Sequence, residues 1–280
     1  MGKLYVVGTP IGNLEDLTPR AARILGEVSL IAAEDTRVTR RLLSHLGIHV
    51  PMVSYNEHNQ HQRLPALLED LGSGDLALVT DAGMPAVSDP GSDLVAQAAA
   101  AGFQVEAVPG VSAVTTALSM SGMSGDGFLF LGFLPRKARE RRAKLEGLTE
   151  STHTLVVFEA PHRLKATLRD ILAVLGEREM SVCRELTKLY EEVFRGTASE
   201  ALAHFSDPRG EFVLVLRGVT PTAAASGPTD DQLEEAGQRL ASLRKDGVRA
   251  KDAVAQVSDA LGMTKNRVYQ MWVESGRTTR

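Results

Sequence analysis

The sequence lacks the features of small secreted proteins and of membrane proteins. Its 280 residues include one cysteine, Cys183, which excludes a disulfide framework and suits a reducing, cytoplasmic environment. No apolar run approaches the ~20 residues that cross a bilayer. The opening MGKLYVVG is typical of a strand rather than of a cleaved leader. Cys183 stands in the run MSVCRE, which predicts a buried strand, so we expect a core residue rather than a nucleophile.

A global excess of positive charge is also missing, because the formal net charge is −4. Aromatic residues are scarce at 5%, which argues against extensive stacking on nucleic-acid bases. Positive charge is concentrated locally, and the densest segment is RKARERRAK, with Arg136, Lys137, Arg139, Arg141, Arg142 and Lys144. A solvated helix face is the simpler interpretation of this segment, and a polyanionic partner is the alternative.

Apolar runs that favour strands alternate with helical patterns, which predicts an α/β fold. The first helix should be capped by Thr18, carry Pro19 in its first turn and end at Gly26, and a later helix should be capped by Ser92. The strands lie closer together in the second half, which predicts hairpins and a mixed sheet there. We expect two lobes at 1–112 and 113–218, a linker at 219–228 and a helical domain at 229–280.

The segment after the linker contains two or three predicted helices. Its end has the outline of a helix-turn-helix, with a turn at Gly262–Met263, a cap at Thr264, and Lys265, Asn266, Arg267 and Gln270 on the second helix. The expected apolar face consists of Ala253, Val254, Val257, Leu261, Val268 and Trp272. A nucleic-acid-binding module and a small helical cap on the main body explain this pattern equally well.

The loop GTPIGN, from Gly8 to Asn13, follows the first predicted strand. A dinucleotide site needs a glycine fingerprint that opens directly into a helix, but here the helix cannot begin before Thr18–Pro19. The G-K-[ST] ending of a phosphate-binding P-loop is absent as well. The loop is therefore suited to close approach by an uncharged group or a cation, and a nicotinamide-dependent enzyme is excluded.

Further polar or glycine-rich loops follow the other strands. The longest, DAGMPAVSDPG (residues 81–91), exceeds the two to six residues that such connections usually take. AAEDTR places Glu34, Asp35 and Arg37 at a strand end, where an acid or the threonine should cap the next helix. SYNEHNQHQR contributes His58 and favours a polar substrate loop over a metal site. Because ligands of open α/β sheets bind at carboxyl strand ends, these loops should surround a cleft.

Together with three further strand-end loops, VPGVSA, FEAPHR and CRELTK, these motifs resemble one branch of a known family. GTPIGNLEDLTPRA, AAEDTR, SYNEHN, DAGMPAVSDPG, VPGVSA, FEAPHR and CRELTK are similar, in this order, to the 16S ribosomal RNA cytidine 2′-O-methyltransferases of the tetrapyrrole methylase family. The resemblance covers the chain from Leu4 to Gly218. Small-molecule methylases of the family usually carry a GDP-type loop where this chain has Met84, so the resemblance favours the RNA-modifying branch.

The resemblance implies a two-lobed class III methyltransferase that acts as a homodimer on the 30S subunit. S-adenosylmethionine (SAM) would lie in a cleft between the lobes. SAM has a positive sulfonium and no phosphate, which agrees with glycine loops that lack a helix-borne anion site. The implied cofactor contacts are Gly8, Pro10, Gly83, Ala86, Val87, Ser112, Ala113, Phe158, Ala160, Leu186, Phe212 and Val213.

Methyl transfer to a ribose hydroxyl needs a group that accepts the proton. Lys188 or Arg37 would orient the RNA backbone, and an acid or His58 would receive the proton. The six basic residues of RKARERRAK are the expected phosphate contacts. Asp81 and Asp89 are expected to brace their loop or to face the methyl acceptor. The candidate catalytic residues are Glu34, Asp35, Arg37, His58 and Lys188, and no metal is expected.

Two alternatives stay open on the sequence alone. A methylase acting on a tetrapyrrole or another small molecule would use the same loops, but it leaves the basic segment unexplained. A non-enzymatic regulator would sense a ligand with its main body and bind DNA through residues 229–280. The density of glycine-rich loops in the main body argues against a purely structural role.

Overall fold

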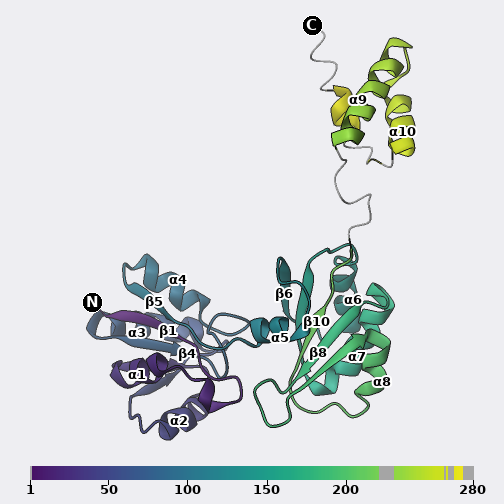
Figure 1. Ribbon diagram of the computed structural model, residues 1–280. Coiled ribbons are helices and arrows are strands. Elements are labelled where there is room, and N and C mark those ends of the chain that lie inside the picture. Colours follow the sequence, from purple (N-terminus) through teal and green to yellow (C-terminus); the bar gives the residue numbers. More distant parts are fainter. Residues whose placement is uncertain (1, 221–229, 262, 264–267, 274–280) are drawn as a thin grey trace. The chain divides into compact units, whose positions relative to one another are not determined.

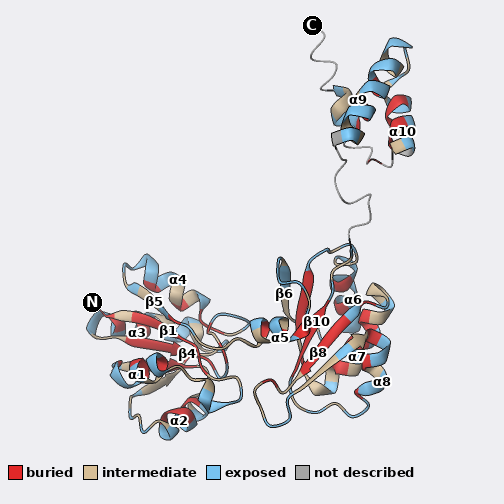
Figure 2. Cartoon of the chain, in the orientation of Figure 1, coloured by how far each residue is buried: buried red, intermediate tan, exposed pale blue. Residues whose placement is uncertain are grey.

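The computed structural model describes residues 2–220, 230–261, 263 and 268–273. The chain divides into two compact units, Met1–Gly218 and Val219–Arg280. The first unit contains two five-stranded sheets and the second contains helices (Figure 1). Each unit has its own buried residues, which are coloured red in Figure 2.

The first sheet is entirely parallel, with the order β3-β2-β4-β1-β5. Side chains alternate between its faces: Tyr5 and Val7 face helices α1 and α2, whereas Leu4 faces α3 and α4. Helices on both faces of a parallel sheet form a doubly wound arrangement, which agrees with the α/β fold that the alternating pattern predicts. The elements are β1 (Lys3–Val7), η1 (Leu14–Asp16), α1 (Pro19–Glu27), β2 (Leu30–Ala33), α2 (Thr36–His45), β3 (Met52–Ser54), α3 (Gln60–Ser73), β4 (Leu76–Val79), α4 (Ser92–Ala100) and β5 (Gln104–Val108).

Local chemistry explains where these helices begin. The Thr18 side chain accepts a hydrogen bond from the Ala21 amide at 3.1 Å, and Pro19 opens α1, as predicted. Asp35 caps α2 by accepting from the Arg37 amide at 2.8 Å. The prediction that Ser92 caps α4 is wrong: the cap is Gly91, whose φ of 143° suits glycine, and Ser92 is already the first helical residue.

The second sheet is mixed, as the close spacing of its strands predicts. Its order is β6-β7-β10-β8-β9, in which β6 and β7 are parallel and the remaining pairs are antiparallel. Helices α6, α7 and α8 pack on one face, and α5 packs on the other. The elements are α5 (Ala113–Ser121), β6 (Phe128–Phe133), α6 (Ala138–Glu146), β7 (Thr154–Glu159), α7 (Pro161–Leu175), β8 (Glu179–Arg184), β9 (Glu192–Thr197), α8 (Ala198–His204) and β10 (Phe212–Leu216).

Two expectations about this lobe can be compared with its packing. Cys183 is completely buried in β8, against α5, as expected for a core residue. Burial also raises the pKa of its thiol to about 11, which leaves little of the nucleophilic thiolate at neutral pH. The boundary expected at 112/113 falls at the start of α5, whose side chains pack against β7, β8 and β10.

The second unit contains α9 (Asp230–Lys245) and α10 (Ala250–Leu261). Its buried side chains include Ala236, Leu240, Ala253, Val254 and Val257, which confirms the apolar face expected on the second of these helices. The Arg244 guanidinium lies over the Trp272 ring, 4.1 Å from its centroid. Of the residues expected on a recognition helix, Gln270 is exposed, whereas Lys265, Asn266 and Arg267 lie outside the described residues, as does the expected cap Thr264.

Candidate active site

The loops that follow β1, β4 and β5 meet at one edge, because carboxyl ends of parallel strands lie together. The Thr9 and Gly83 backbones exchange two hydrogen bonds, of 2.9 and 3.0 Å. The Gly8 amide donates to the Val108 carbonyl at 3.0 Å, and the Thr9 hydroxyl donates to the Thr80 carbonyl at 3.1 Å. The three loops therefore form one hydrogen-bonded backbone surface rather than three independent connections.

Gly8 and Gly110 let two of these loops touch backbone to backbone. A Cβ atom on Gly8 would lie 2.7 Å from both the Cα and the N of Gly110, and 2.7 Å from the sulfur of Met84. These distances are shorter than real Cβ contacts, so a side chain at Gly8 would push the loops apart. The first glycine of GTPIGN thus serves loop packing, a role that the pattern alone did not distinguish from ligand contact.

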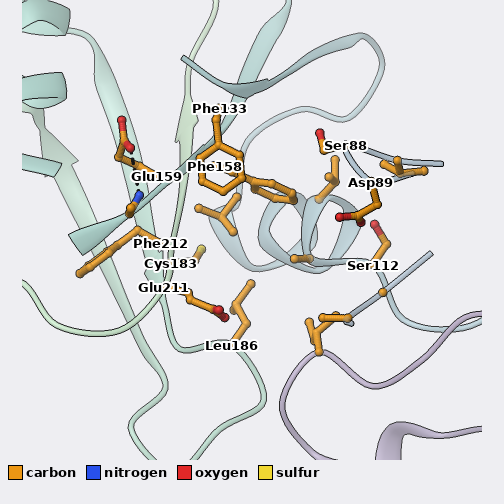
Figure 3. Close-up of a pocket in the computed structure, with 18 of the residues that line it drawn as sticks. Ser88, Asp89, Ser112, Phe133, Phe158, Glu159, Cys183, Leu186, Glu211 and Phe212 are labelled. Atoms are coloured by element: carbon orange, nitrogen blue, oxygen red, sulfur yellow. Dashed lines mark hydrogen bonds between the residues drawn. The ribbon is translucent and has the colours of Figure 1, made fainter. Parts of the chain in front are cut away.

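A cavity of about 500 Å³, here called the main cavity, opens above these loops (Figure 3). Its volume lies within the ~300–1,000 Å³ typical of small-molecule sites. Both lobes contribute to its wall. Nine of the expected cofactor contacts line it, namely Gly83, Val87, Ser112, Ala113, Phe158, Ala160, Leu186, Phe212 and Val213, whereas Gly8, Pro10 and Ala86 do not.

The wall of the main cavity is largely apolar and carries no lysine or arginine among the described residues. Phe133 and Phe158 form an aromatic edge, with ring centroids 5.7 Å apart, and Phe133 is 55% exposed. Asp89, Glu159 and Glu211 supply carboxylates. A wall with acids and without cations disfavours a phosphorylated ligand and tolerates a positive one, so the residues present fit a sulfonium cofactor such as SAM.

A second pocket of about 500 Å³, here called the side pocket, shares Ser88 with the main cavity. Four of the five predicted catalytic residues line it: Glu34, Asp35, Arg37 and His58. The remaining lining residues are Thr36, Ser54, Asn56, Glu57, Asp81, Ser88 and Pro90. The sequence thus predicted the grouping of these polar residues, but not their separation from the apolar cavity.

Lys188, the fifth candidate, lies elsewhere. Its Nζ pairs with Glu185 at 3.0 Å and with Glu211 at 2.8 Å, and its aliphatic stem lies against Gly12. Although partial desolvation opposes it, hydrogen bonding to both carboxylates raises the pKa of Lys188, so the side chain stays charged. Lys188 joins the second lobe to the GTPIGN loop beside the main cavity and is not grouped with Glu34, Asp35 and His58.

The acids of the side pocket differ in how they are held. Glu34 accepts a hydrogen bond from the Asp81 amide at 3.2 Å, and Asp81 accepts one from the Asp35 amide at 3.1 Å, so both brace the loops that carry them. Burial raises the pKa of Glu34 and of Asp81. Hydrogen bonds from Arg37 lower the pKa of Asp35 to about 2, which makes Asp35 a weak base.

The expectation that all six basic residues of RKARERRAK contact RNA phosphates is wrong for Arg141. Arg141 is 4% exposed, and its guanidinium pairs with Asp170 on α7 at 2.5 Å, so it cannot serve as a surface contact for phosphate. Arg142 shares the same carboxylate at 2.6 Å, and the Lys144 ammonium donates to the Leu131 carbonyl. Of the six basic residues, Arg136, Lys137 and Arg139 are exposed, and in the described chain their side chains form no hydrogen bond or ion pair with another element. Lys137 pairs only with Glu140, three residues further along.

Several residues of the main cavity carried no recognisable signal in the sequence. Phe133 ends an ordinary apolar strand, and His162 follows the proline that opens α7. Glu159 is buried and fully engaged: it accepts from the Ala160 amide at 2.9 Å and from the Thr167 hydroxyl, and it pairs with Arg163 at 3.2 Å. The sequence predicts a loop at the FEAPHR motif, residues 158–163, but the bracing role of its acid depends on Thr167, which lies one helical turn further along.

Membrane-spanning helices and metal-binding clusters are both missing from the described residues. None of the helices in the described part of the chain combines the length and hydrophobicity that crossing a bilayer requires. Nor do three or more histidine, cysteine or acidic side chains among the described residues converge so that they could hold a metal ion.

Two α/β lobes with strand-end loops around a shared apolar cavity are the architecture of the class III methyltransferases. The solved structures that share this fold include the following three. Native uroporphyrin III C-methyltransferase from Thermus thermophilus has a TM-score of 0.57 at 22% identity, covering 77% of this chain and 97% of that chain. The same enzyme in complex with S-adenyl homocysteine has a TM-score of 0.58. A diphthine synthase has a TM-score of 0.59 at 13% identity, and the match covers 77% of this chain and 90% of that chain.

Residues 3–202 match the family described as Tetrapyrrole (Corrin/Porphyrin) Methylases, and the chain belongs to this family. Among its relatives is ribosomal RNA small subunit methyltransferase I of Synechocystis, 45% identical over 278 residues and 98% of each chain. The protein of that name from Thermotoga maritima is 50% identical over 221 residues, 78% of this chain and 99% of its own.

Proposed function

We propose that this protein transfers a methyl group from SAM to the ribose 2′-hydroxyl of a cytidine in 16S ribosomal RNA, within the small ribosomal subunit. The observation that carries the proposal is the pairing of two cavities at one sheet edge. The main cavity is apolar and lacks cations, which suits SAM, and the adjoining side pocket is polar, which suits a nucleotide. The names of the relatives, which are ribosomal RNA small subunit methyltransferases, support the choice of acceptor.

Bound SAM would supply an electrophilic methyl carbon on a positively charged sulfur. Gly83, Ser112, Ala113 and Ala160 of the cavity wall would hold such a ligand, while Phe158 and Leu186 would exclude water. Holding the acceptor oxygen in line with the methyl carbon is the main catalytic contribution expected of such a site. Arg37, whose side chain is 83% exposed at the side pocket, would orient an RNA phosphate.

The RNA surface is proposed to include the exposed residues Arg136, Lys137 and Arg139, which precede or open α6. Lysine and arginine contacts to phosphates position an RNA without selecting its sequence. The cytoplasmic homodimer that the family resemblance implies is a further proposal. It is supported by Phe128 and Leu129 on the edge strand β6, which are 38% and 37% exposed. Their replacement by serine should convert a dimer into monomers in analytical ultracentrifugation.

The deciding experiment is transfer of a labelled methyl group from SAM to 30S subunits that lack the modification. The labelled nucleotide is then mapped, and the position of the methyl group on it is determined by mass spectrometry. We expect one cytidine to carry the label on its 2′-oxygen. Label on a base or on a protein, or efficient transfer to a tetrapyrrole with none to 30S subunits, would overturn the proposal.

A further inference from the structure

Asp89 occupies the point where the main cavity and the side pocket meet. It lines the main cavity, while its neighbours Ser88 and Pro90 line the side pocket. Figure 3 shows its carboxylate turned into the cavity, on the same side as Ser88 and Ser112. A nucleotide in the side pocket that reaches toward a methyl donor in the main cavity must pass this side chain.

The Asp89 carboxylate has no hydrogen-bond or ion-pair partner within the described chain, although the residue is half-buried. Among the described residues, Glu57 of the side pocket also has no hydrogen-bond or ion-pair partner, but it does not line the main cavity. The remaining acids of the two cavities are occupied. Asp35 is bound to Arg37 at 2.6 Å, Glu34 to the Asp81 amide, and Glu211 to Lys188 at 2.8 Å. Asp89 is therefore the acid beside the main cavity whose oxygen atoms are free to bind a substrate.

The loop holds Asp89 in one place. Ser88 has a φ of 64°, Gly91 has a φ of 143°, and Pro90 restricts the residue before it. A Cβ on Gly91 would lie 2.8 Å from Leu78 of β4, so this part of the loop packs directly on the sheet. A side chain on such a fixed backbone suits a role that needs defined geometry.

The surrounding charges make Asp89 more basic than an ordinary aspartate. Burial first, and then the negative charges of Glu34, Asp81 and Glu57, raise the pKa of Asp89 to about 7. The other titratable residues that line the main cavity are His162, Glu211, the engaged Glu159 and the buried Cys183. Arg37 in the side pocket offsets the charge of Asp81. A base that ionises near the working pH is the most effective kind for proton transfer.

We propose that Asp89 is the catalytic residue that accepts the proton of the ribose 2′-hydroxyl, and this inference rests on the proposed function. The 2′-oxygen forms a bond to the methyl carbon, the carbon–sulfur bond breaks, and its electron pair stays on sulfur, giving neutral S-adenosylhomocysteine. The hydroxyl proton passes to the Asp89 carboxylate and then to water. The aspartate must be ionised to act, so activity should rise with pH until Asp89 is deprotonated.

The test uses the full-length protein with 30S subunits that lack the methyl group. Asp89→Asn should lower the single-turnover rate at pH 7.5 by 100-fold or more, within the ~10²–10⁴ range of general-base catalysis. SAM affinity, measured by calorimetry, should change less than threefold. The matched control is Asp93→Asn, in the first turn of α4 and outside both pockets, which should keep at least a third of the rate.

The pH dependence separates a proton acceptor from a merely structural acid. The wild-type rate should rise tenfold per pH unit at low pH and level off at or below about pH 7, because a bound sulfonium favours the ionised carboxylate. The rate of the Asp89→Asn variant should not rise with pH over this range. Independently of activity, ¹³C NMR of labelled aspartate in the wild-type protein alone should show one carboxyl that titrates near neutral pH, and the signal should be absent from the variant.

Three outcomes would overturn the inference. The first is an Asp89→Asn rate within threefold of the wild-type rate. The second is a rate that rises with pH in that variant as it does in the wild type. The third is an NMR titration with every carboxyl in the ordinary acidic range, which decides the matter even if the variant does not fold. Failure of the wild-type protein to methylate 30S subunits would instead overturn the proposed function, so the two failures are distinguishable.

Discussion

Replacing Asp170 by asparagine tests whether the basic helix α6 is divided into a structural part and an RNA-facing part. The Asp170 carboxylate accepts from the Arg141 Nε at 2.8 Å, pairs with a terminal nitrogen of the same guanidinium at 2.5 Å, and accepts from the Arg142 Nε at 2.6 Å. The Arg141 and Asp170 side chains are 5% and 3% exposed, whereas that of Arg142 is 55% exposed. The substitution leaves the Arg141 charge buried without its counterion.

The expected cost follows from this burial. Removing one partner of a buried ion pair typically costs about 3–5 kcal/mol, and the lost contact with exposed Arg142 adds no more than about 1 kcal/mol. With a urea m value of about 3 kcal/mol per molar, a loss of about 3–5 kcal/mol lowers the unfolding midpoint by about 1–1.7 M. The assay is urea unfolding of the full chain, followed by circular dichroism.

The matched control is Arg139→Ala, on the same helix but exposed and without a bond in the described chain. A surface substitution of this kind should change stability by less than about 0.5 kcal/mol. If Asp170→Asn moved the midpoint by less than about 0.3 M, the Arg141–Asp170 pair would not be structural. Arg141 would then return to the set of possible RNA contacts.

Three further predictions concern the loops, the RNA surface and pH. Gly8→Ala should destabilise the protein by about 1–3 kcal/mol through overpacking and weaken SAM binding in calorimetry, whereas Gly72→Ala, where an added Cβ meets nothing within 4 Å, should be neutral or stabilising. Arg139→Ala should reduce the slope of log affinity for RNA against log salt by about 0.7, and an unchanged slope would remove Arg139 from the RNA surface. Because the pKa of Asp89 is raised on folding to about 7, the folded state binds the extra proton, so stability should fall as the pH rises from about 4 to 7. Asp89→Asn should flatten this decline in urea midpoints, and an identical decline in the variant would contradict the assignment.

The convergence of the site loops could be predicted from the sequence because it depends on local signals. Each loop follows an apolar run, and parallel pairing alone brings carboxyl strand ends to one edge. Which charged side chains are exposed and which are buried in ion pairs could not be predicted in this way. Arg141 is indistinguishable from Arg139 in the segment RKARERRAK, and only the packing of α6 on α7 buries it against Asp170.

Lys188 shows the same limit. Its position after a strand indicates a site residue, but its partner Glu211 comes from the loop before β10 and is brought close by the antiparallel pairing of β8 with β10. For Asp89, the sequence indicates the loop position but not the absence of a partner. Its position in DAGMPAVSDPG indicates a polar residue in a strand-end loop. Only the structure, which gives the hydrogen bonds of the neighbouring acids, shows that the Asp89 carboxylate has no partner in the described chain.

Backbone strain gives independent reason to regard these loops as functional. The non-glycine residues with positive φ in the described chain are Ala86, Ser88, Glu185 and Thr187, at 67°, 64°, 51° and 66°. All four lie in two loops that contribute lining residues to the main cavity, namely Val87, Ser88 and Asp89 from one loop and Leu186 from the other. Each such conformation costs about 1–3 kcal/mol unless its surroundings compensate.

The two loops are held in these conformations by specific contacts. The first is tied to GTPIGN through the paired backbones of Thr9 and Gly83. In the second, the Glu185 carboxylate accepts from the Glu211 amide at 2.9 Å, and the Thr187 amide donates to Glu191 at 2.6 Å. A plain connection between elements would relax to a lower-energy shape. Strain confined to two braced walls of one cavity therefore indicates a backbone preorganised to receive a ligand there.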